Sequence, residues 1–138
     1  MPDIFSKIIS GEIPSHKIAS SGNCFAFLDI NPLKPGHCLC VHKDEIADLF
    51  AMSSVSYMEL LSFTHKVAQA LQDAIPCERV TLTVLGFEIP HAHIHLIPVN
   101  NEAEANFKNT RIKCTPSELE NVRKKIAYSY SSLFSNTP

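Results

Sequence analysis

Apolar residues recur along the chain at helical and at strand spacing, and the helical spacing predicts three helices. Near the N-terminus the pattern fits a short helix over about 3–10, which Gly11 ends. In the middle of the chain it fits a long helix over about 54–73, and Pro76 prevents its continuation. A capping-box sequence predicts a last helix over about 115–130.

Shorter runs of apolar and β-branched residues predict five strands. They cover about 16–20, 23–29, 37–41, 78–85 and 91–98. Ser21-Gly22 predicts a hairpin turn between the first two strands, whereas the two prolines of 31–36 predict a loop. The expected fold class is α+β: a five-stranded antiparallel meander sheet with one long inserted helix, a short N-terminal helix and a C-terminal helix. Two βαβ units are the alternative, but a single long helix separates strands here.

The composition is that of one globular domain over 1–138. Hydrophobic residues make up 45% of the chain and charged residues 19%. The net charge of −2 provides no basic surface, so no nucleic-acid partner is expected. The stretch 100–114 is polar and is predicted to be a mobile segment.

The cysteines and the N-terminus indicate where the protein works. The five cysteines are odd in number and irregularly spaced, which favours reduced, buried thiols over a disulfide framework. The N-terminus lacks the charged and apolar regions of a signal peptide, and no stretch approaches the roughly 18 consecutive apolar residues of a membrane helix. We therefore expect a cytoplasmic protein with no membrane partner.

Histidines alternate with apolar residues in the run His91-Ala92-His93-Ile94-His95. Alternate residues of a strand point to the same face, so three imidazoles are expected to form a row. A solvated polar row is one interpretation, but imidazoles that protonate near pH 6.5 would repel one another in mild acid. A metal site is a second interpretation. The Cα atoms of His91 and His95 lie about 13 Å apart in a strand, which is too far for all three rings to bind one ion. Two adjacent rings could bind zinc together with ligands from elsewhere in the chain.

Nucleophilic catalysis is the interpretation that the row of histidines favours. A neutral imidazole can attack phosphorus and form a covalent intermediate that water later breaks. Neighbouring rings disfavour one another's protonation, and a carbonyl that accepts the Nδ1 proton leaves the Nε2 lone pair free. The central ring has a partner on each side, one of which can protonate the leaving group. His93 is therefore the predicted nucleophile.

The run 91–97 also resembles the His-φ-His-φ-His-φ-φ signature of the histidine triad (HIT) superfamily. Three further segments resemble that family in order: 3–14 its N-terminal helix and turn, 25–32 its ribose-binding strand, and 35–37 its fourth histidine. The resemblance covers about 3–99 and is to the branch of histidine triad nucleotide-binding proteins and bacterial HIT hydrolases. It implies an α+β fold and a homodimer.

The resemblance implies roles for individual residues. His93 would attack the α-phosphorus, and His95 would contact the phosphate and assist proton transfer. His91 and His37 would hold the network behind them. The implied nucleotide-binding residues are a carboxylate that accepts hydrogen bonds from the ribose hydroxyls and three apolar residues around the base: Asp29, Phe27, Ile30 and Ile18. Gly86 is a further candidate from its residue type, because a glycine lets backbone N–H groups approach a phosphate. From the residues alone, the carboxylate would cap a turn.

Two features depart from the relatives' pattern. Many relatives bind a structural zinc through a Cys-x-x-Cys, a later histidine and the first triad histidine. The first three of these positions hold Asp3, Ser6 and Glu45 here, which predicts that no structural zinc is bound. The connection 86–90 is also shorter than in relatives, and Glu88 places negative charge where an amide or hydroxyl usually contacts the phosphates.

The sequence thus predicts a hydrolase, without cofactor, that cleaves the α-phosphate linkage of purine nucleoside phosphoramidates through a covalent nucleotidyl-histidine. Dinucleoside polyphosphates are the second substrate class, and Lys34, Lys43 and Arg79 are candidate phosphate contacts. An alternative from another functional class is a dimeric adaptor that binds nucleotides without catalysis and would keep the same histidines. Replacement of His93 separates the two, because an enzyme loses turnover while it retains nucleotide affinity.

Overall fold

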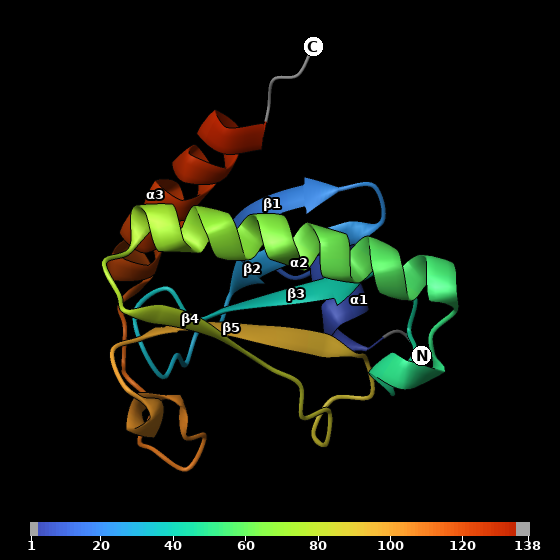
Figure 1. Ribbon diagram of the computed structural model, residues 1–138. Coiled ribbons are helices and arrows are strands. Elements are labelled where there is room, and N and C mark those ends of the chain that lie inside the picture. The colour runs from blue at the N-terminus through green and yellow to red at the C-terminus, as the bar shows by residue number, and fades with distance from the viewer. Residues whose placement is uncertain (1–2, 135–138) are drawn as a thin grey trace.

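The computed structural model describes residues 3–134, so 1–2 and 135–138 of the expected single domain lie outside the described residues. The described residues form five strands, three α-helices and two 3-10 helices (Figure 1). The elements are α1 (Ile4–Ile9), β1 (Lys17–Ser21), β2 (Cys24–Leu28), β3 (Cys38–His42), η1 (Leu49–Ala51), α2 (Ser54–Ala74), β4 (Arg79–Thr83), β5 (His93–Val99), η2 (Glu102–Ala105) and α3 (Pro116–Phe134). None of the described helices combines the length and the apolar character needed to cross a membrane.

The strands form one antiparallel sheet, which confirms the predicted α+β fold class. The strand order is β1-β2-β3-β5-β4, so one step departs from a simple meander. β3 and β4 are both antiparallel to β5 and therefore parallel to each other, and parallel strands need a long crossover. α2 supplies that crossover by running across the sheet (Figure 1), which leaves the position between β3 and β4 for β5.

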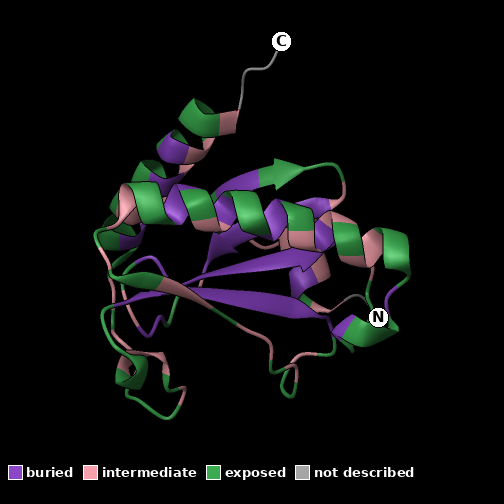
Figure 2. Cartoon of the chain, in the orientation of Figure 1, coloured by how far each residue is buried: buried purple, intermediate pink, exposed green. Residues whose placement is uncertain are grey.

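The main core lies between the sheet and α2 and α3. Leu60 and Val67 of α2 pack there with Ile94 and Leu96 of β5, and all four side chains are buried. Figure 2 shows that β3 and β5 are buried along their length. Because neighbouring residues of a strand face opposite ways, His93 and His95 point to the other side of the sheet.

A second, smaller apolar cluster covers that other side. Phe5 of α1 packs there with Phe27 of β2 and with Leu39 and Val41 of β3. Within β2, Phe27 belongs to this cluster while its neighbours belong to the main core, so α1 and α2 cover opposite faces. α1 is thereby placed beside the histidines.

Segment 100–114, which the sequence predicts to be mobile, is held against the sheet. It contains η2, and Ala105 and Phe107 pack on a buried cluster that includes Leu33 and Ile97. The Ile112 amide donates a hydrogen bond to the Pro32 carbonyl at 2.8 Å. Polar composition therefore did not indicate how closely this segment packs.

Candidate active site

His93 begins β5, and its own backbone sets the direction of its ring. Nδ1 lies 2.8 Å from the carbonyl oxygen of His91. A carbonyl only accepts hydrogen bonds, so Nδ1 carries the proton and donates it, and the Nε2 lone pair is left free. The side chain is 7% exposed, which leaves a small accessible edge. This is the arrangement that a nucleophilic imidazole needs.

His95 stands next along β5 and pairs with the fourth histidine. Its ring centroid lies 5.0 Å from that of His93, and its Nδ1 lies 2.9 Å from Nε2 of His37. The Leu33 amide donates to Nδ1 of His37 at 3.0 Å, so the His37 proton must sit on Nε2. That proton points at Nδ1 of His95, which leaves the His95 proton on Nε2. His95 therefore presents a proton donor beside the free Nε2 of His93.

Burial keeps both paired rings neutral. It lowers the pKa of His37 to about 3, helped by the Arg111 charge. Burial likewise lowers the pKa of His95 to about 3, helped by the neighbouring His37 and His93 rings. Both rings are therefore uncharged at neutral pH, and the proton positions deduced from the hydrogen bonds apply.

His91 differs from the expected row of three imidazoles. Its amide donates to the Ile89 carbonyl in a turn, so β5 starts two residues later and the ring turns towards α1. Nδ1 lies 2.9 and 3.1 Å from the two Asp3 oxygens, and Nε2 lies 2.6 Å from the His42 carbonyl oxygen. Because acceptors face both nitrogens when Asp3 is ionised, the geometry lets both His91 nitrogens donate, one of them to Asp3.

Asp3 makes two kinds of contact at the start of α1. Its carboxylate caps the helix by accepting the Ser6 amide at 2.9 Å, and it pairs with His91. Burial raises the pKa of Asp3, but the hydrogen bonds from Ser6 and His91 outweigh it and bring the pKa below its ordinary 3.8. Asp3 thus joins α1 to the residue whose carbonyl orients His93.

The positions that hold zinc in relatives do not fit that metal here. Ligand atoms of Asp3, Glu45 and His91 lie within 4.8 Å of one another. However, the Asp3 amide donates to Glu45, and both nitrogens of His91 are used as hydrogen-bond donors. A protonated nitrogen offers no lone pair, the group holds no thiolate, and the buried Ser6 hydroxyl is a weak ligand.

The structure brings two of the predicted nucleotide-binding residues to the histidines. Phe27 belongs to the cluster with Phe5, at 5.7 Å between ring centroids. Asp29 follows β2, and its Oδ2 lies 3.7 Å from Nε2 of His37. Its other oxygen accepts the Asn31 amide at 2.8 Å, so Asp29 caps the turn as well. Ile30 beside it is 60% exposed.

Ile18 and Gly86, the other two predicted nucleotide-binding residues, are not linked to the histidines by contacts like those of Phe27 and Asp29. The ladder between β1 and β2 shifts register between Lys17 and Ala19, and this irregularity turns Ile18 into the main core. Ile18 and Phe27 therefore belong to different apolar clusters, and a role of Ile18 at the base stays a prediction. Gly86 has φ +73, and a Cβ added there would lie 3.8 Å from the Ala47 carbonyl oxygen.

Three residues near the histidines were not singled out from the sequence. The Phe5 ring lies 4.9 Å from the His93 ring, and the Phe107 ring lies 4.8 Å from that of His95. Arg111 pairs with Asp29 at 3.3 Å. Phe5 falls within the predicted N-terminal helix, but the helical pattern does not indicate what the ring packs against. The other two residues lie in the polar segment 100–114.

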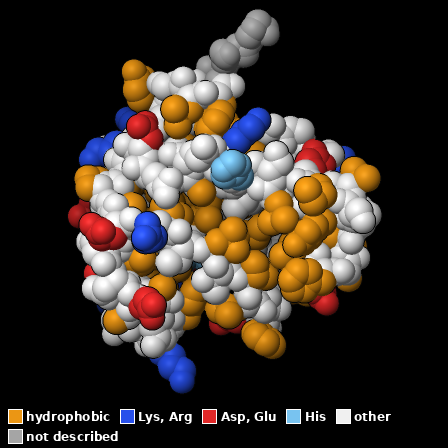
Figure 3. All heavy atoms as spheres, in the orientation of Figure 1, with side chains coloured by type: hydrophobic (Ala, Val, Ile, Leu, Met, Phe, Trp, Pro, Cys, Tyr) orange, Lys and Arg blue, Asp and Glu red, His pale blue; other side chains and the backbone are white. Residues whose placement is uncertain are grey.

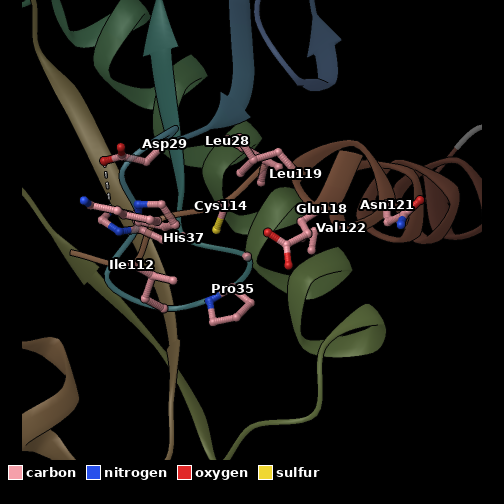
Figure 4. A pocket seen from close by; sticks show the side chains of 13 residues that line it. Leu28, Asp29, Pro35, His37, Ile112, Cys114, Glu118, Leu119, Asn121 and Val122 are labelled. Carbon is pink, nitrogen blue, oxygen red and sulfur yellow. Dashed lines mark ion pairs between the residues drawn. The ribbon is translucent and has the colours of Figure 1, made fainter. Parts of the chain in front are cut away.

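Two cavities flank the site. The first, about 250 Å³, lies between α1 and β2 and is lined by apolar side chains that include Ile8, Phe25 and Phe27. The second, about 340 Å³, lies between the loop that carries Asp29 and His37 and helix α3 (Figure 4). His93 lines neither cavity. It is linked to the first through Phe5 and Phe27 and to the second through His95 and His37.

Solved structures and sequence relatives identify this α+β fold with its histidine cluster. A HIT-like protein from Bartonella henselae, described as involved in cell-cycle regulation, superposes with a TM-score of 0.80 at 26% identity. The alignment covers 92% of this chain and 95% of that one. The HIT domain matches residues 10–102. The chain belongs to the HIT family, as the sequence motif predicted.

Two sequence relatives add detail. Protein hit of Bacillus subtilis is 30% identical over 134 residues, which cover 90% of this chain and 91% of that protein. The adenosine 5'-monophosphoramidase hnt1 of Schizosaccharomyces pombe is 33% identical over 103 residues, covering 74% and 77% respectively. A hydrolase function is thereby supported at the level of the family.

Proposed function

We propose that the protein hydrolyses purine nucleoside phosphoramidates at the α-phosphorus through a covalent intermediate on His93. The observation that supports this proposal is the arrangement of two neighbouring rings. His93 has a free Nε2 lone pair and His95 carries a proton on Nε2, and the two ring centroids lie 5.0 Å apart. One group can attack while the other protonates the leaving atom.

The reaction runs in two displacements. Nε2 of His93 attacks the α-phosphorus, a nitrogen–phosphorus bond forms, and the bond to the leaving nitrogen breaks. The leaving nitrogen keeps the bonding electrons, takes the Nε2 proton of His95 and departs as an amine. His95 is left as an imidazolate, whose negative charge is balanced by the positive charge that the His93 ring acquires when it bonds to phosphorus and keeps its Nδ1 proton. Water then attacks phosphorus and returns a proton to His95, and the nucleoside monophosphate leaves as the bond to His93 breaks.

The surrounding residues bind and orient the substrate. Asp29 accepts hydrogen bonds from the ribose hydroxyls, since each carboxylate oxygen can accept more than one. The purine enters the apolar cavity that Phe27 lines. Ile30, whose side chain is exposed beside Asp29, is the further residue proposed to contact the base. The backbone at Gly86 approaches the phosphates, and the short loop with Glu88 favours a small leaving group that carries little negative charge.

Competing substrates test this proposal. Adenosine 5'-phosphoramidate should be hydrolysed with a higher kcat/KM than a diadenosine polyphosphate, because the latter's leaving group is highly anionic and meets Glu88. The release of AMP, monitored by chromatography, gives the kcat/KM value for each substrate. If the diadenosine polyphosphate is the better substrate, dinucleoside polyphosphates replace phosphoramidates as the proposed substrate class. Binding of AMP without turnover of either compound would favour a non-catalytic nucleotide-binding adaptor.

We infer that two copies associate through β4. This strand lies at an edge of the sheet, and Leu82 and Leu85 are 55% and 45% exposed. Hydrophobic side chains gather on the face that carries α2 and β4 (Figure 3), and exposed apolar strand edges favour pairing.

Substitution of Leu82 by Asp should therefore convert a dimer into a monomer, as measured by sedimentation velocity. The matched control is Leu133→Asp on α3, where the parent side chain is 49% exposed and lies away from β4. A parent protein that sediments as a monomer would contradict the assignment, as would a Leu82→Asp variant that remains dimeric.

The state of the cysteines supports a cytoplasmic location, which we also propose. All five are free. Burial raises the pKa of Cys24 and of Cys40 to about 12, so these thiols stay protonated and unreactive. Reduced, buried thiols are typical of proteins from a reducing compartment.

A further inference from the structure

Residues 102–112, here called the strap, cross the end of the site formed by Asp29 and His37. Most of the strap lies beyond the region that matches the HIT domain, 10–102. Glu104 pairs with Lys34 at 3.1 Å, and the Ile112 amide bonds to the Pro32 carbonyl. The strap is thus attached at both ends to the loop that connects β2 with β3.

Phe107 of the strap packs against the paired histidines. Its ring lies 4.8 Å from His95 and 6.0 Å from His37, edge-on in both cases. The Arg111 guanidinium lies 5.6 Å from the Phe107 ring centroid, within the range of a cation–π contact. Phe107 therefore holds Arg111 beside the histidine pair.

Arg111 reaches from the strap to the proposed ribose-binding carboxylate. Its Nη1 lies 3.3 Å from Oδ2 of Asp29 and 2.5 Å from the Asn31 carbonyl oxygen. The guanidinium is about one-third exposed, whereas the Asp29 side chain is 15% exposed. Of the predicted phosphate contacts, Lys34 is paired with Glu104 instead.

The position of Asp29 makes its charge a problem for the substrate. Ligand atoms of Asp29, His37 and His95 lie within 4.8 Å of one another. An ionised carboxylate so close to the ring that contacts the phosphate would repel an anionic α-phosphate, while both paired rings are neutral. A cation that leaves some of the Asp29 lone pairs free removes this repulsion and still permits ribose binding.

We propose that Arg111 is a positioning residue for Asp29, which it neutralises and orients so that the ribose hydroxyls of an anionic nucleotide can be bound. This inference rests on the proposed nucleotide site but not on turnover. The strap then provides ribose selectivity from outside the family-matching region.

Binding of AMP and of 2',3'-dideoxy-AMP by calorimetry tests the proposal. Arg111→Gln should weaken AMP binding by roughly 10-fold, the order expected for a charge-assisted contact, and should weaken dideoxy-AMP binding by clearly less. The matched control is Lys108→Gln, which removes the same charge from an exposed strap residue. Arg111→Lys should restore part of the affinity.

Two results would overturn the proposal. One is equal weakening of both nucleotides by Arg111→Gln, which would show that Arg111 acts on the phosphate or on folding and does not orient Asp29 for the ribose. The other is an Arg111→Gln variant that binds AMP like the Lys108→Gln control. An absence of phosphoramidate turnover in the parent would instead reject only the catalytic function, because the ribose selectivity is read from binding.

Discussion

Replacing His93 by Asn is expected to lower the turnover of adenosine 5'-phosphoramidate by about three orders of magnitude or more. The reason is that Asn cannot supply the Nε2 lone pair that is freed when Nδ1 of His93 donates to the His91 carbonyl. Nucleotide affinity should change only a few-fold, because Asp29 and Phe27 remain in place.

His65→Asn is the matched control for this variant. His65 lies on the exposed side of α2, so the same substitution should leave turnover unchanged. A His93→Asn protein that turns over substrate like the parent would remove His93 as the nucleophile. A variant that loses nucleotide affinity together with turnover would show that the ring binds the nucleotide and would contradict the assigned role.

Replacing Asp3 by Ala is expected to lower the free energy of unfolding by about 3 kcal/mol, which combines a lost helix cap with a buried His91 ring left without its partner. The His91 side chain is fully buried and that of Asp3 is 12% exposed, so water compensates little. Urea unfolding measures the change.

The effect of Asp3→Ala should depend on pH in a defined direction. The pKa of Asp3 is lower in the folded protein than its ordinary 3.8, so its contribution is fully present above that pH and is lost as the pH falls through the folded value. Parent and variant should therefore converge in acid. Asp48→Ala, which removes only the cap of η1, is the control. An equal loss in both variants would contradict the buried pair.

The helices and the positions of His93 and His95 could be predicted because local periodicity determines them. Helical spacing placed α2 within one residue of its observed end, and strand alternation placed His93 and His95 on the face opposite Ile94. These features depend on near neighbours in the chain, which the sequence displays directly.

Long-range contacts determine what the sequence did not predict. His91 leaves the row because Asp3, 88 residues away, accepts from its ring. Arg111 reaches Asp29 across 82 residues, and a strand irregularity turns Ile18 into the core. The strand order follows from the path of α2 across the sheet, which no local pattern encodes.

Mass analysis of the intact protein, quenched rapidly after mixing with adenosine 5'-phosphoramidate, shows whether His93 carries the nucleotidyl group during turnover. We expect a gain of one adenylyl group, located by peptide mapping on His93 and absent from the His93→Asn variant. Turnover that continues while the adduct forms on His95, or forms on no residue of the chain, would contradict this expectation.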